Sequence, residues 1–140
     1  MGAAAVLRAA GDLGATADAL VLESPFDRLL TTVEHRFELM HVPSFPCARL
    51  LLFWGGLQLG FDAVRFAPAE SARGVSVPTL VMAGDRDPYV TVDDTGRVFA
   101  SLAGPKRLEL FPGATHQCLV RADRARWMRV TCQFLGGLTR

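Results

Sequence analysis

Short apolar runs alternate along the chain with longer segments in which apolar residues recur every three or four positions. The short runs are typical of buried strands, and the longer periodic segments are typical of helices that pack by one face. Three runs predict strands, at residues 19–25, 78–83 and 108–111. Six segments predict helices, at residues 2–10, 27–40, 47–59, 69–72, 91–102 and 121–138. This alternation predicts an α/β fold with about three parallel strands and flanking helices.

The unit from residue 78 to residue 116 organises the candidate chemistry. Its two strands are joined by a helix that begins at Thr91 as N-cap, with Asp94 in the capping-box position. A connection of this size makes the strands parallel and its crossover right-handed. The loops that follow them, Gly84-Asp85-Arg86-Asp87 and Gly113-Ala114-Thr115-His116, then leave the edge of the sheet where open α/β sheets bind their ligands. The sequence therefore predicts that a carboxylate and an imidazole meet there.

These two loops resemble the acid loop and the histidine loop of the α/β-hydrolase superfamily, which occur in the same order. The superfamily's nucleophilic serine lies in Gly-x-Ser-x-Gly, and no such pentapeptide occurs in the 140 residues. Met1-Gly2-Ala3-Ala4-Ala5 is instead similar to the second half of such a nucleophile elbow. The resemblance implies the C-terminal half of a serine hydrolase, beginning one residue after its nucleophile. Ser24-Pro25-Phe26 and an apolar insert make the serine-aminopeptidase-like and lipase-like branches the nearest.

The resemblance implies roles for three residues. His116 is the base that takes the proton of the nucleophile, and Asp87 is the acid that orients the imidazole. Asp85 stays open as the alternative acid, because one residue of loop geometry could exchange the two. The backbone N–H of Met1 belongs to the oxyanion hole. Because removing a nucleophile costs on the order of 10⁶ in turnover, we expect the chain as given to be inert by itself.

Other candidate nucleophiles and bases match the pattern less well. Ser24 follows a strand, but the proline after it is a poor start for an elbow and no glycines flank it. Cys118 is too close to His116 in the sequence for the usual approach and is expected to be a buried small side chain. His35 and His41 lie in the insert and are expected to be solvated or to face a lid.

The sequence predicts a single domain over residues 1–140. Within it, residues 27–66 form a longer connection than a crossover between two strands requires. The superfamily commonly carries a helical lid or cap at this place. The insert has enough apolar surface to line an acyl or aromatic pocket, supplied by Phe37, Met40, Phe45, Phe53, Trp54, Leu57 and Phe61. Plain packing of these side chains on the sheet is the alternative.

Composition narrows the classes of function. A net charge of +1 gives no electrostatic argument for binding nucleic acid or an anionic membrane. No apolar run approaches the ~20 residues that cross a bilayer. The 3 cysteines lack metal-type spacing, and their odd number argues against a disulfide framework. We therefore expect a cytoplasmic protein that needs neither a metal nor another cofactor.

Three functions stay open at this point. The first is a hydrolase fragment that acts on a small-molecule ester, amide or other acyl bond once upstream residues complete it. The second is a non-catalytic binding or assembly module, which pairs the open edge of its first strand with a partner or with another copy of itself. The third is a different reaction on the same scaffold, such as acyl transfer or haloalkane cleavage.

Overall fold

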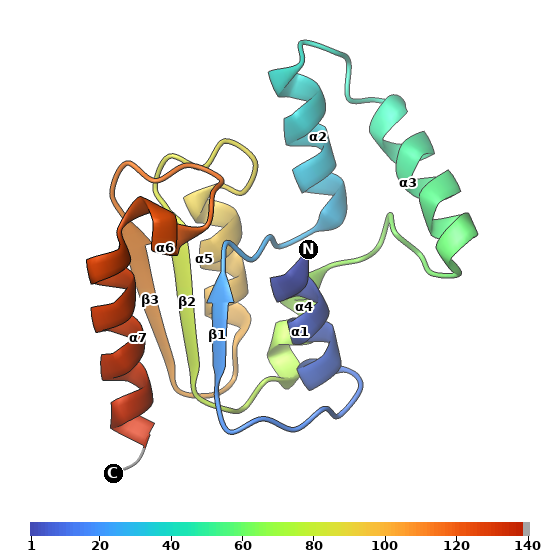
Figure 1. The fold of residues 1–140 in the computed structure, drawn as a ribbon. Helices are drawn as coiled ribbons and strands as arrows, with labels where there is room; N and C mark the ends of the chain where they lie inside the picture. Colours follow the sequence, from blue (N-terminus) through green and yellow to red (C-terminus); the bar gives the residue numbers. More distant parts are fainter. Residues whose placement is uncertain (139–140) are drawn as a thin grey trace.

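A three-stranded parallel sheet forms the centre of the computed structural model, which describes residues 1–138. Its strands are β1 (Leu20–Glu23), β2 (Thr79–Gly84) and β3 (Lys106–Phe111), in the spatial order β1-β2-β3 (Figure 1). The three strands run in the same direction, so their carboxyl ends share one edge of the sheet. The predicted fold class is confirmed.

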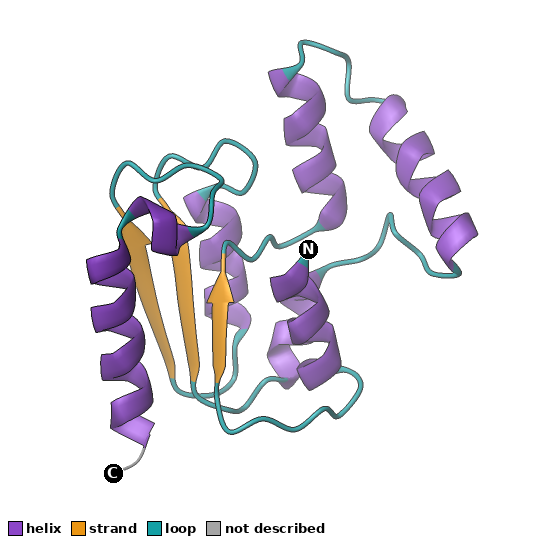
Figure 2. Cartoon of the chain, in the orientation of Figure 1, coloured by secondary structure: helices purple, strands orange, loops and turns teal. Residues whose placement is uncertain are grey.

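Helices cover both faces of the sheet and extend beyond its carboxyl edge (Figure 2). The described helices are α1 (Gly2–Gly11), α2 (Leu29–Leu39), α3 (Cys47–Leu59), α4 (Pro68–Ser71), α5 (Val92–Ser101), α6 (Leu119–Ala122) and α7 (Arg124–Leu138), with a 3₁₀ turn at Ala72–Gly74. Helix α3 begins and ends at the residues predicted from the sequence, 47 and 59. Helix α5 begins with the predicted capping box, in which Thr91 and Asp94 each accept a hydrogen bond from the other's backbone N–H.

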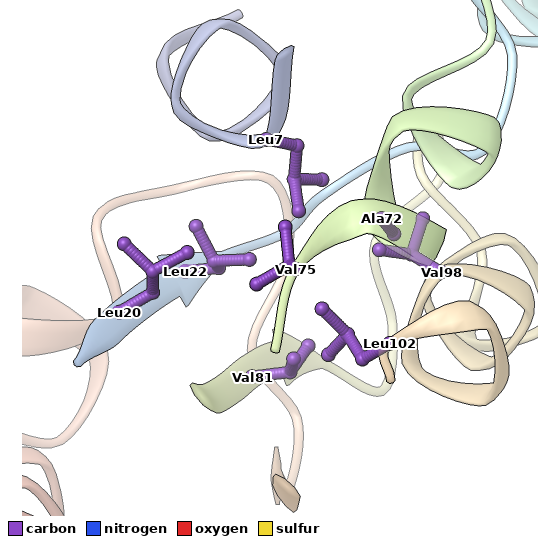
Figure 3. Close-up of a cluster of buried hydrophobic side chains, with 8 residues drawn as sticks. All are labelled: Leu7, Leu20, Leu22, Ala72, Val75, Val81, Val98 and Leu102. Carbon is purple, nitrogen blue, oxygen red and sulfur yellow. The ribbon is translucent and has the colours of Figure 1, made fainter. Parts of the chain in front are cut away.

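Every residue of β2 is buried, because helices cover both of its faces. Val81 faces one core cluster, which α1, β1 and α5 complete with Leu7, Leu22 and Val98 (Figure 3). Its neighbours Leu80 and Met82 face the opposite cluster, under α6 and α7. Successive side chains of a strand point to opposite faces of the sheet, and both faces are buried here. The sequence of β2 is therefore an unbroken apolar run with no alternation of apolar and polar positions.

Helices α2 and α3 stand together beyond the carboxyl edge of the sheet (Figure 1). Helix α2 has no fully buried residue, and α3 buries only Ala48, Leu52 and Gly56. Several large apolar side chains of the insert are exposed, namely Leu39, Met40, Phe45, Leu50, Leu51, Phe53, Trp54, Leu57 and Leu59. Most of these side chains therefore do not pack on the sheet.

The prediction of one continuous closing helix is wrong. The helix is interrupted at Asp123, whose backbone is extended with φ −151° and ψ 90°. The Asp123 carboxylate accepts a hydrogen bond from the N–H of Arg126, and its carbonyl accepts one from the N–H of Trp127. Asp123 therefore begins α7 as a new helix. Trp127 packs inward from α7, against the core cluster that contains Leu80 and Met82.

Helix α2 begins two residues later than the predicted segment 27–40, and its N-cap is Arg28, so Asp27 lies before the helix. The buried Asp27 carboxylate accepts hydrogen bonds from the N–H of Arg28 and from Nε of Arg97, at 2.6 and 2.7 Å. Arg97 also pairs with the carboxylate of Asp94. The hydrogen bond to Asp27 raises the pKa of Arg97 above its ordinary value. Asp27 thus ties the chain after β1 to α5.

Candidate active site

Asp87 lies in the loop that follows β2 and has a side chain that is fully buried. Its Oδ1 accepts hydrogen bonds from the backbone N–H groups of Tyr89 and Val90, at 2.9 and 3.0 Å. A buried carboxylate is costly unless donors compensate its charge, and these two N–H groups do so. They also fix the orientation of the carboxylate, so that Oδ2 faces the loop after β3.

His116 lies in that loop, and its Nδ1 is 2.7 Å from Oδ2 of Asp87. With Nδ1–H donating to the carboxylate, Nε2 is the ring nitrogen left to exchange a proton with a bound molecule. The ring of Tyr89 packs edge-on against the imidazole, with 5.3 Å between ring centroids. The two groups that the sequence places at one edge of the sheet are therefore in hydrogen-bond contact.

Asp85, the alternative acid, has a different contact. Its Oδ1 accepts a hydrogen bond from the backbone N–H of Gly113 at 2.6 Å. Two backbone bonds join the same loops, from the N–H of Asp85 to the carbonyl of Phe111 and from the N–H of Arg86 to the carbonyl of Ala114. Asp85 thus holds the histidine loop in place, while Asp87 contacts the imidazole.

Gly84 sets how closely these two loops approach. A Cβ at this position would collide with the backbone carbonyl oxygen of Ala114, which cannot move without displacing the histidine loop. We expect Gly84→Ala to lower the free energy of unfolding by about 2–3 kcal/mol, as overpacked sites do. Chemical denaturation measures this change, and the NMR signals of the His116 ring report whether the loop has moved.

Gly96→Ala is the matched control. A Cβ at Gly96 meets nothing within 4 Å, and the residue lies in the middle of α5. Alanine there should raise the free energy of unfolding by about 0.5–1 kcal/mol, because glycine weakens a helix interior. If Gly84→Ala proves as harmless as Gly96→Ala, the loops do not depend on this close approach.

Met1 lies at the start of α1, next to His116. Both residues line a cavity of about 600 Å³ that also contacts Ser24 and the exposed side of β1 at Val21. The structure thus places the residue expected to form the oxyanion hole on the same side of the sheet as the Asp87–His116 pair. Ser24 lies there too, at the end of β1, and has a φ of 44°. A positive φ is uncommon for serine and marks local strain.

A second cavity, of about 400 Å³, lies between the edge of the sheet and α2. Most of its walls are apolar, and they include two of the side chains that the sequence singles out in the insert, Phe37 and Met40. Phe53, Leu57 and Phe61 line a separate cavity beside α3. The insert therefore contributes to a pocket at His116 mainly through α2.

Some residues near the site differ from what the sequence indicates. His35 is not simply solvated: its Nδ1 is buried and lies 3.8 Å from Oδ2 of Asp94. His41 is exposed, as expected, and Cys118 is also exposed, so its predicted burial is wrong.

Glu23 is a functional-site neighbour that sequence analysis misses. Its carboxylate accepts hydrogen bonds from Nε1–H of Trp127 at 2.7 Å and from the N–H of Leu119 at 3.3 Å. It thereby ties the end of β1 to the helices that follow the histidine loop. An ionisable residue at the end of an apolar strand is the signal that could have identified it.

Neither metal-binding clusters nor long apolar helices occur over residues 1–138. No group of three or more His, Cys, Asp or Glu side chains in this range is arranged to hold a metal ion. No helix in the same range is long and apolar enough to cross a membrane.

Comparison with known proteins gives matches to part of the chain in sequence and to nearly all of it in structure. No family model matches the chain. A non-heme haloperoxidase of Rhodococcus erythropolis is 36% identical over 55 residues, which are 39% of this chain and 20% of that protein. The chain thus spans only a minor part of the length of the curated relatives it matches.

Solved structures match almost the whole chain. An esterase of Pyrococcus furiosus superposes with a TM-score of 0.69 and 17% identity, over 96% of this chain and 49% of the esterase. An α/β-hydrolase from a deep-sea metagenome superposes with a TM-score of 0.65 and 12% identity, over 96% of this chain and 62% of that protein. The chain therefore has part of the α/β-hydrolase fold, the fold that its two loops predict.

Proposed function

We propose that Asp87 and His116 are the acid and the base of an acyl-hydrolase site, and that the residue preceding Met1 supplies its serine. The observation that carries the proposal is the 2.7 Å contact between Nδ1 of His116 and Oδ2 of Asp87, at the edge of the sheet where α1 begins. The esterase among the similar structures supports hydrolysis of a small-molecule ester or related acyl bond.

In the proposed mechanism, Nε2 of His116 takes the proton of the serine hydroxyl and later gives it to the leaving group. Asp87 keeps Nδ1 protonated and stabilises the imidazolium that forms between these two steps. The backbone N–H of Met1, once it is an amide, donates to the oxyanion of the tetrahedral intermediate. The chain's own residues thus supply the acid, the base and one oxyanion donor.

The proposal also includes a lid and a cellular compartment. Helices α2 and α3, within residues 27–66, act as a lid, because α2 forms one wall of the cavity at His116. The free, exposed thiols of Cys47, Cys118 and Cys132 support a reducing, cytoplasmic environment.

A binding or assembly module is the second candidate. Among the described residues β1 pairs only with β2, so its other edge offers unpaired backbone groups beside the exposed Val21. Such an edge is a template for pairing with another strand. In the hydrolase proposal, the strand that leads to the serine occupies this edge. In the module, a partner chain does.

Labelling with a fluorophosphonate probe tests the proposal. The 140-residue chain should stay unlabelled, whereas a version extended by the residues encoded before Met1 should be labelled at the serine that precedes Met1. Mass spectrometry of the labelled peptide identifies the residue.

Two outcomes oppose the proposal. An extended version that carries a serine before Met1, yet is never labelled, contradicts hydrolase function and leaves the assembly module. Labelling of the 140-residue chain that disappears in Ser24→Ala identifies Ser24 as the nucleophile, and the expected inertness of the chain is then wrong.

A further inference from the structure

Arg36 of α2 is an exposed residue that lines the cavity between α2 and the edge of the sheet, and His116 lines the same cavity. Its guanidinium carbon lies 4.8 Å from the centre of the Tyr89 ring, which is within the range of a cation–π contact. The Tyr89 ring in turn lies 5.3 Å from the imidazole centre of His116. Taken in series, these two distances put the guanidinium at most about 10 Å from the candidate base.

The guanidinium of Arg36 has no carboxylate partner among residues 1–138. Arg28, Arg97 and Arg126 each pair with a carboxylate, but no carboxylate pairs with Arg36 and no acceptor takes a hydrogen bond from its guanidinium. Glu34 and Glu38 are two positions away on the same helix, and residues at that spacing do not face each other. Stacking on Tyr89 restricts the guanidinium and leaves the N–H groups of its edge able to bind a planar anion by two hydrogen bonds.

Much of the rest of this cavity is apolar and can lie against a hydrocarbon chain. Of the described residues that line it, Arg36 is the only lysine, arginine, aspartate or glutamate, and Phe26, Val33 and Phe37 are among the others. A cationic side chain at one position of a mostly apolar pocket fixes the orientation of a ligand by its charged end.

We propose that Arg36 binds a carboxylate of the substrate, so that the site takes an acyl compound with a free carboxylate at the other end of a short hydrocarbon chain. A half-ester of a short dicarboxylic acid is the simplest member of this class. The carboxylate pairs with Arg36, the chain lies along the apolar wall, and the ester group reaches His116. The position of the ester group at His116 rests on the proposed hydrolase function. The binding of the carboxylate rests on Arg36 alone.

Binding to the 140-residue chain tests the inference without any need for turnover. The probe is monoethyl glutarate, and its neutral counterpart is ethyl valerate, in which a methyl group replaces the carboxylate. NMR titration should show shifts at His116 and Tyr89, and monoethyl glutarate should bind about tenfold or more tightly than ethyl valerate, in line with a charge-assisted hydrogen bond. Added salt should reduce this preference.

Three variants assign the preference to Arg36. Arg36→Gln should remove it, and Arg36→Lys should keep only part of it, because lysine lacks the two-pronged donor edge. Arg49→Gln is the matched control, since Arg49 is an exposed arginine on α3 that does not line this cavity. It should bind like the parent protein. Equal denaturation midpoints for the variants show that each is folded.

The possible failures can be told apart. If the parent protein binds the two probes equally well, or if Arg36→Gln keeps the full preference, the assignment of Arg36 is wrong, whatever the fluorophosphonate result. If the preference depends on Arg36 but the extended protein is never labelled, anion binding stands and the hydrolase proposal fails.

Discussion

In a version of the protein extended to include the proposed serine, Asp87→Asn should lower turnover by about 10⁴ and His116→Ala by about 10⁶. Asparagine at position 87 can donate to Nδ1 of His116 and so favours the wrong tautomer of the imidazole. Its side chain also loses the negative charge that stabilises the imidazolium. Alanine at position 116 removes the base itself. Hydrolysis of a nitrophenyl ester, followed by absorbance, measures both effects.

Asp85→Asn is the matched control for Asp87→Asn, because it makes the same substitution two residues earlier in the same loop. Asp85 accepts a hydrogen bond from the N–H of Gly113 through Oδ1, and an asparagine oxygen can accept the same bond. Turnover should therefore fall by no more than about tenfold, an amount that corresponds to 1.4 kcal/mol. A larger loss for Asp85→Asn than for Asp87→Asn would show that Asp85 is the acid and that the observed contact of Asp87 is not the catalytic one.

The fold could be predicted largely because its central strand and its crossover helix carry strong local signals. The apolar run of β2 is short enough to exclude most helices, and the capping box of Thr91 and Asp94 marks the start of α5. The apolar period continues through Asp123, so the hydrophobic pattern predicts one helix where the structure has two. Whether Asp123 caps a new helix depends on its backbone angles, which the hydrophobic pattern does not report.

The site could be predicted only where chain order determines position. The carboxyl ends of neighbouring parallel strands meet, so the loop that carries Asp85 and Asp87 is brought next to the loop that carries His116. The choice between Asp85 and Asp87 depends on the turn after β2, and the sequence leaves it open. The contacts of Glu23 and Arg36 join segments far apart in the chain, and no local pattern contains them.

Phe111→Ala should have the largest effect on stability, because Phe111 belongs both to the core and to the base of the site. Its side chain is 1% exposed and packs in the cluster that includes Leu80 and Leu119. Its carbonyl accepts hydrogen bonds from the N–H groups of Asp85 and Ala114, one in each loop. Truncating a buried phenylalanine costs about 3–5 kcal/mol, which is a large part of the ~5–15 kcal/mol that stabilises a typical domain. Urea denaturation measures the loss.

Phe53→Ala is the matched control, since Phe53 lies on α3 and is 56% exposed. Its loss should change the free energy of unfolding by less than about 1 kcal/mol, because little apolar surface is returned to water.

If Phe111→Ala unfolds the protein, Phe111→Leu keeps most of the buried volume and should still fold, with a smaller loss of stability. In that variant the contact between His116 and Asp87 should persist, because the two carbonyl hydrogen bonds belong to the backbone. Equal effects of Phe111→Ala and Phe53→Ala would mean that the core under α6 and α7 does not stabilise the loops that carry the site.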